Sequence, residues 1–261
     1  MGRGSSKAGG GGGGQSSGAP TSSLPLNVNN SPTNAKPLSD AYVDKLRKQE
    51  DASYDASTTA AVKMYISAAD FDNQGHSLSQ TMNYLLDNGV DLNTADVKKI
   101  NKQYGLRLNQ NDLASMQYTN AYLSSAVHSI GQDAVLLRGA HDDMLRNAFG
   151  INDYSKLSQS QLQSQLVGKA MRTTSFWSTS YDDNRNPFTS SKSSVSGGRE
   201  VIYNIRAGKN TKCVIGAKKQ SEIVLDKGTN FKVTGVRYTG RTATPKGKGS
   251  RPQIEIDLET F

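Results

Sequence analysis

Apolar residues recur at helical spacing through the first half of the chain. The clearest run starts at Asn111 and keeps a three- and four-residue period as far as Ile130, where Gly131 ends it. Ser39 can cap a helix that continues to about residue 66, and Gly89 follows another helical run as a C-terminal stop. Together these patterns predict helices over residues 39–66, 77–88, 111–130 and 158–167, with a short one from Asn93 or Thr94.

From residue 134 onward the pattern changes to short apolar runs of strand length. They predict strands over residues 134–138, 173–178, 200–206, 212–215, 222–225, 231–238 and 253–258. In the last run Ile254, Ile256 and Leu258 alternate with polar residues, as expected for a strand with one buried face. Helices followed by strands predict an α+β domain rather than a doubly wound parallel sheet.

The first 37 residues differ from the rest of the chain. They contain a run of glycines over residues 9–14, several prolines and few apolar side chains. Such a segment buries too little surface to offset its ordering entropy. We therefore predict a disordered tail over residues 1–37 and one domain over residues 38–261, mainly helical over 38–133 and mainly β over 134–261.

Neither a disulfide nor a membrane segment is predicted. Cys213 is the single cysteine, which fits a reducing compartment or a fold that needs no covalent staple. No apolar stretch approaches the ~20 residues of a membrane helix, and the N-terminus lacks the apolar core of a signal peptide. The expected location is the cytoplasm, or the protein is delivered into a target cell or carried by a virus particle.

Positive charge is concentrated in one part of the chain. The net charge is +8, and eight basic residues but only one acid, Glu200, lie between Arg185 and Lys219. A basic stretch suits an anionic cofactor, an acidic protein target or nucleic acid, although it can equally be a solvated surface.

Three short motifs carry candidate chemistry. Arg138-Gly139 follows an apolar strand, and arginine can grip a phosphate while glycine lets a ligand approach the backbone. The hydroxyl run of residues 178–180 follows an aromatic pair. Gln220 and Glu222 precede an apolar strand and are predicted to share one face of it, roughly 7 Å apart. Each motif alone is typical of an ordinary strand end or loop.

Several other classes of site are missing from the sequence. There is no Gly-x-Gly-x-x-Gly fingerprint after a strand and no P-loop. The three histidines have no cysteine partners at zinc spacing, so no metal site is predicted.

In order along the chain, the three motifs resemble the Arg–Ser–Glu class of ADP-ribosyltransferases, which includes clostridial exoenzymes and related toxins. The resemblance covers about residues 110–240. It implies an ADP-ribosyltransferase-like fold in which two packed β-sheets form an NAD cleft, with a helical region before them. The chain departs from the family pattern at Ser175, where glycine is frequent, at Trp177, where an aliphatic residue is usual, and in a turn after residue 225 that lacks the common proline.

The resemblance also implies roles for individual residues. NAD is the substrate, and cleavage of its nicotinamide–ribose bond passes through an oxocarbenium-like state. Glu222 would stabilise that positive charge and Ser178 would hold Glu222. Arg138 would grip the NAD phosphates, and Gly139 would hold the nicotinamide amide.

Further cofactor and acceptor contacts are implied in the same way. The cofactor-binding set implied by the family is completed by Thr179, Ser180, Arg185 and Phe188. Gln220 stands where the family has glutamate in enzymes that modify arginine, so it indicates another acceptor. A protein acceptor is favoured over guanine in nucleic acid, because few aromatic residues interleave with the basic ones.

Two other functions remain open at this stage. An enzyme of the same fold can act as an NAD glycohydrolase, with water as the acceptor. The other alternative is a noncatalytic basic protein that binds nucleic acid or belongs to a particle, behind a flexible tail.

Overall fold

The computed structural model describes residues 34–182, 199–244 and 249–261. Five helices come first: α1 (Asp40–Ser53), α2 (Ala56–Ile66), α3 (Leu78–Asp87), α4 (Val97–Tyr104) and α5 (Gln110–Ala126). Two more, α6 (Asp143–Phe149) and α7 (Gln159–Leu166), lie between strands. Within the described residues, no helix is both long enough and apolar enough to cross a membrane.

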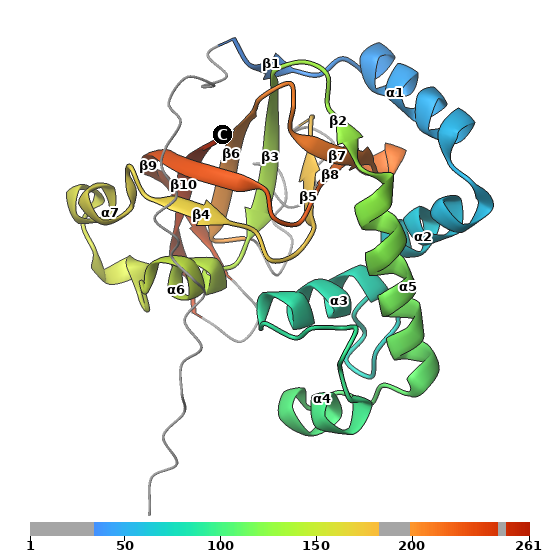
Figure 1. The fold of residues 1–261 in the computed structure, drawn as a ribbon. Coiled ribbons are helices and arrows are strands. Elements are labelled where there is room, and N and C mark those ends of the chain that lie inside the picture. Colours follow the sequence, from blue (N-terminus) through green and yellow to red (C-terminus); the bar gives the residue numbers. More distant parts are fainter. Residues whose placement is uncertain (1–33, 183–198, 245–248) are drawn as a thin grey trace, which may run out of the picture.

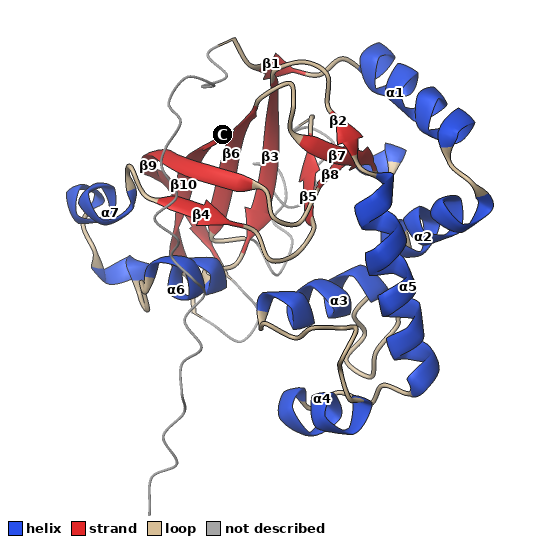
Figure 2. Ribbon diagram, in the orientation of Figure 1, coloured by secondary structure: helices blue, strands red, loops and turns tan. Residues whose placement is uncertain are grey.

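The strands lie mainly in the second half of the chain. They are β1 (Lys36–Pro37), β2 (His128–Ser129), β3 (Ala134–Ala140), β4 (Ala170–Arg172), β5 (Trp177–Ser180), β6 (Val201–Ala207), β7 (Lys212–Ile215), β8 (Glu222–Leu225), β9 (Asn230–Ala243) and β10 (Arg251–Thr260). This arrangement confirms the predicted α+β class (Figure 2).

All the strands belong to one hydrogen-bonded sheet, in the order β2-β7-β8-β5-β3-β6-β10-β9-β4, with β1 also on β3. The two separate sheets implied by the resemblance are therefore joined here. The connection is narrow, because β3 and β5 share the single pair Leu137–Ser180, whereas β3 pairs with β6 along its whole length. The sheet thus consists of two halves, β2-β7-β8-β5 and β3-β6-β10-β9-β4, that meet at one point.

Two hydrophobic clusters form the core. The larger spans both halves of the sheet: it packs β3, β6, β9, β10 and α7 with side chains of β5, β7 and β8, and it includes Trp177 and Tyr203. The smaller packs α3, α4 and α5 against the half β2-β7-β8-β5 and includes Phe176, Val214 and Val224. The helical region predicted before residue 133 therefore covers the strands that carry the serine and glutamate motifs (Figure 1).

Local signals explain several differences from the predicted elements. The single helix predicted over residues 39–66 is two helices, because Asp55 caps α2 by accepting the Thr58 N–H at 2.7 Å. Lys36 and Pro37, assigned to the tail, pair in parallel with Ala134 and Val135. Residues 1–33 of the predicted tail lie outside the described residues.

The strand predicted over residues 173–178 starts later and continues to residue 180 as β5. Residues 173–176 connect it to β4, a short strand that the apolar pattern did not reveal. Helix α6 was not predicted either.

Candidate active site

Arg138 lies in β3 and reaches across to the next strand. Its Nη1 donates to the carbonyl oxygen of Ser178 at 2.8 Å, and its guanidinium lies 5.0 Å from the ring centre of Trp177. Burial lowers the pKa of Arg138, and the negative charge of Glu222 is among the influences that oppose this shift. The buried Nε of Arg138 has no acceptor among the described residues, so the side chain keeps a free donor.

The hydroxyl run occupies the end of β5, and its three members face different surroundings. Ser178 is half-buried. Its side chain lies beside Tyr65, and a hydrogen bond between the two lowers the pKa of Tyr65. Thr179 donates to the Ile223 carbonyl at 2.7 Å. Ser180 donates to the Gln220 carbonyl at 3.0 Å. Thr179 and Ser180 thus fasten β5 to the segment that carries Glu222, whereas the Ser178 hydroxyl lies beside Tyr65.

Glu222 begins β8 and is buried, with 7% of the residue exposed. Its Oε2 accepts the Ala217 N–H at 2.8 Å. Gly216 lies so close that an added Cβ would sit 2.4 Å from Oε2 and 2.5 Å from Cγ of Glu222. The connection between β7 and β8 therefore folds back over the carboxylate and holds it through one backbone donor.

Gln220 does not share a strand with Glu222, as the sequence had predicted. It is exposed at the end of a short 3-10 helix, Lys218–Gln220, and Ser221 then adopts a left-handed conformation with φ 49°. The alternation of a strand does not extend through such a turn, so the predicted common face is wrong. Gln220 instead stands on the surface of the connection beside Lys218 and Lys219.

The strand register brings the three motifs together. Ser180 is paired with Glu222, and Ser178 with the neighbouring Val224, so both serines share a face of the sheet with Glu222. Arg138 enters from the other half of the sheet at its single connection point. Gly139, next to it, pairs with Ile202 in β6. Segments 40 to 84 residues apart in the sequence therefore meet at the junction of the two halves.

The helices contribute further residues that the sequence did not single out. Tyr65 of α2 is buried, and its hydroxyl accepts a hydrogen bond from Asn83 of α3 at 2.9 Å. Burial raises the pKa of Tyr65 to about 12, and Glu222 and Arg138 are close enough to influence it. No local pattern marks these two residues, because tyrosine and asparagine on helices are common in any core or surface.

Arg199 is a second arginine at the site. Burial lowers its pKa, and repulsion from Arg138 lowers it further, which places the two positive charges near each other. Arg199 also contacts the ring of His141, whose Nδ1 lies 2.8 Å from Glu200. In the sequence Arg199 is only one of many basic residues. Its position just before the apolar strand that starts at Val201 was the available signal. Arg185 and Phe188 lie outside the described residues.

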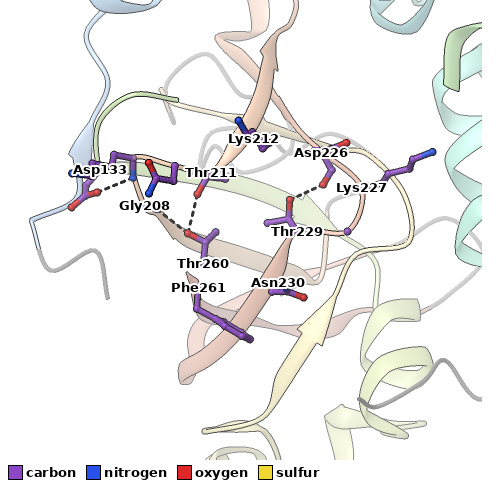
Figure 3. A pocket seen from close by; sticks show the side chains of 13 residues that line it. Asp133, Gly208, Thr211, Lys212, Asp226, Lys227, Thr229, Asn230, Thr260 and Phe261 are labelled. Atoms are coloured by element: carbon purple, nitrogen blue, oxygen red, sulfur yellow. Dashed lines mark hydrogen bonds between the residues drawn. The ribbon is translucent and has the colours of Figure 1, made fainter. Parts of the chain in front are cut away.

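A separate cavity of about 430 Å³ lies at the other end of β7 and β8. Figure 3 shows it between the start of β7, the turn at Asp226 and the chain end at Phe261. The Asp226 N–H donates to the Lys212 carbonyl beside this cavity. Glu222 lies at the opposite end of the pair formed by β7 and β8. Because none of the motif residues lines this cavity, it is distinct from the candidate active site.

The family match identifies the class of protein as a transferase that uses a nucleotide. The chain belongs to the ADP-ribosyltransferase exoenzyme family, whose pattern it matches over residues 79–259. The predicted family is thereby confirmed. Comparison with curated protein sequences gives no match.

Solved structures show the same fold at low sequence identity. The enzymatic component C2-I of the C2-toxin from Clostridium botulinum is similar with a TM-score of 0.54 and 18% identity, over 85% of this chain and 48% of that one. C3stau2 from S. aureus, solved with NAD, has a TM-score of 0.54 and 16% identity, over 85% and 93%. The ADP-ribosylating toxin BECa of C. perfringens, solved with NADH, has a TM-score of 0.58 and 14% identity, over 85% and 47%. The present chain therefore spans about half the length of two of these proteins and most of the third.

Proposed function

We propose that the protein is an NAD-dependent mono-ADP-ribosyltransferase that modifies a protein side chain. The observation that carries the proposal is the convergence of Arg138, Ser178 and Glu222 where the two halves of the sheet meet. The family membership supports the same activity. We assign the activity to one domain, residues 38–261, because the helices before residue 133 and the strands after it both contribute to the site.

The arginines fit the pyrophosphate of NAD. Arg138 and Arg199 repel each other, and a dianionic group between them would relieve that repulsion. The unpartnered Nε of Arg138 supplies a donor for a phosphate oxygen. In this proposal Arg138 and Arg199 hold the phosphates and Gly139 presents its backbone to the nicotinamide amide. The other predicted cofactor contacts, Arg185 and Phe188, remain predictions from the sequence.

Glu222 provides the charge that the reaction needs. When the bond between the ribose C1′ and the nicotinamide nitrogen breaks, nicotinamide leaves with the bonding electrons and C1′ becomes positive. The carboxylate of Glu222 stabilises this charge, and Ser178 lies on the same face to position it. The acceptor then bonds to C1′ and loses a proton. The protein's part is positioning and electrostatics, with no metal required.

The surface around Gln220 indicates the kind of acceptor. Gln220 is exposed directly before the catalytic strand, and Lys218 and Lys219 next to it are exposed as well. We infer an acceptor other than arginine, presented by a protein whose surface near the modified residue is acidic. C2-I belongs to a toxin and BECa is a toxin, and their similarity in fold supports delivery into a target cell.

The test compares Glu222→Gln with Glu259→Gln, which makes the same change on β10, four strands away in the sheet. Each purified variant is incubated with labelled NAD and a cell lysate, and the label is followed into protein, nucleic acid and free ADP-ribose. We expect Glu222→Gln to lose about a hundredfold or more of the wild-type rate, as for other single electrostatic stabilisers, and Glu259→Gln to keep it.

The distribution of the label separates the competing functions. Label in protein supports the proposal, label in nucleic acid indicates a guanine acceptor, and free ADP-ribose alone indicates an NAD glycohydrolase. If the wild type neither consumes NAD nor is stabilised by it, the protein is a noncatalytic binding protein and the proposal is wrong.

A further inference from the structure

One face of helix α1 contacts the connection between β7 and β8. The three side chains involved, Asp44, Arg47 and Glu50, are spaced at three-residue intervals and so lie along one side of the helix. Asp44 accepts from Lys218 Nζ at 3.0 Å, and Glu50 Oε1 accepts the Ile215 N–H at 2.8 Å. Between them, Arg47 Nη1 donates to the Gly216 carbonyl at 2.9 Å. Helix α1 thus holds the end of β7 and the connection that follows it at three points.

The middle contact leads directly to the catalytic carboxylate. The Gly216 carbonyl and the Ala217 N–H belong to the same planar peptide unit. Arg47 donates a hydrogen bond to the carbonyl oxygen of that peptide unit. The N–H of the same unit, which belongs to Ala217, donates to Glu222 Oε2 at 2.8 Å. Because the unit is rigid, the contact with Arg47 sets the direction in which the N–H points. A charged donor on the carbonyl also polarises the peptide and strengthens the bond at its other end.

Burial prevents the Gly216–Ala217 peptide from turning independently of Glu222. Gly216 is buried and lies within contact distance of the Glu222 side chain, so the peptide plane cannot turn without moving the carboxylate. The Nε of Arg47 is buried without a partner among the described residues, so the bond to Gly216 is the one its guanidinium makes there.

We propose that Arg47 is a positioning residue for Glu222, acting through the Gly216–Ala217 peptide. The proposal rests on the proposed function, because it assigns Arg47 a part in the same reaction. Arg47 precedes the region that matches the family, residues 79–259, so an element outside that region tunes the catalytic group.

The test compares Arg47→Met with Lys48→Met. Both remove one positive charge from α1, but Lys48 is exposed, whereas Arg47 is half-buried and bonded to Gly216. For Arg47→Met we expect kcat to fall about tenfold, as for the loss of one hydrogen bond to a charged group, while KM for NAD stays within about twofold. Lys48→Met should retain the wild-type values. Arg47→Lys, which keeps a charged donor, should lie between wild type and Arg47→Met.

The pH profile distinguishes positioning from a general loss of structure. A weaker N–H bond to the carboxylate disfavours its charged form, so the acidic limb of kcat should move to higher pH in Arg47→Met and stay in place in Lys48→Met. The proposal is overturned if Arg47→Met matches Lys48→Met, or if its rate falls with no movement of the acidic limb. If Arg47→Met does not fold, Arg47→Gln, too short to reach Gly216, takes its place.

A second measurement does not depend on activity. Hydrogen exchange of the amides over residues 216–222 should be faster in Arg47→Met than in Lys48→Met, because the peptide has lost one of its two anchors. Equal exchange in the two variants would refute the contact. A wild type without transferase activity would overturn the proposed function alone, since the exchange result still decides whether Arg47 holds this peptide.

Discussion

A single methyl group at Gly216 should displace the carboxylate of Glu222, to which we assign the catalytic role. The Gly216 backbone has no positive φ, so alanine fits its conformation, and the effect of Gly216→Ala is purely steric. The new Cβ would lie 2.4 Å from Oε2 and 2.6 Å from Cδ of Glu222, whereas ordinary contact begins at about 3.4 Å. Oε2 must therefore move away by about 1 Å, the difference between 2.4 Å and the ordinary contact distance of 3.4 Å.

This displacement should lower the reaction rate. A shift of about 1 Å can lower a rate about a hundredfold, because the transition state depends on close alignment. It also stretches the 2.8 Å bond from Ala217 to Glu222 beyond hydrogen-bonding range, and a bond to a charged group contributes about 1.5–3 kcal/mol. We expect kcat of Gly216→Ala to be about a hundredfold below wild type, with KM for NAD nearly unchanged.

The matched control is Gly208→Ala. Gly208 also lacks a positive φ, but its added Cβ would lie 3.6 Å from Thr260 Oγ1, an ordinary contact. Transfer kinetics with labelled NAD, together with thermal unfolding of both variants, measure the effect. If Gly216→Ala keeps the wild-type kcat and folds normally, the carboxylate does not act from the position described above.

Two further predictions concern stability. Trp177 is fully buried against Arg138, Tyr203 and Phe231, so Trp177→Ala should lower the free energy of unfolding by about 3–5 kcal/mol in a denaturant titration, and a loss below about 1 kcal/mol would contradict this. The hydrogen bond from His128 to Glu50 raises the pKa of His128 above 6.5, so its stabilising contribution is full below pH 6.5 and is lost as the pH rises through the folded-state pKa. The midpoint of thermal unfolding of the wild type should therefore fall more between pH 6 and 8 than that of His128→Gln, and equal slopes would refute the linkage.

The sequence predicts the strands around the site better than the site itself. The apolar run of Glu222–Leu225 and the alternation within β10 are local patterns, and the structure has strands at both places. The order of the three motifs was enough to identify the family. By contrast, the position of Gln220 depends on the left-handed backbone at Ser221, which an L-residue adopts only when its surroundings favour it.

The contacts that hold Glu222 could not be predicted, for a physical reason. Arg47 and Gly216 are separated by 169 residues, and neither lies in a pattern that refers to the other. Helical periodicity showed that α1 has an apolar side but not which strand connection its polar residues would reach. The role of Arg199 could not be predicted for the same reason. Arg199 comes near Arg138 only when β6 pairs with β3.

The narrow junction between β3 and β5 determines how the two halves of the sheet are held together. With Leu137 and Ser180 as the single backbone pair there, Arg138 and Glu222 belong to two halves of the sheet that are held together mainly by packed side chains. Side chains such as Arg138, rather than a ladder of amides, set the angle between the two halves. If NAD binds as proposed, it contacts both halves and would further stabilise the angle between them.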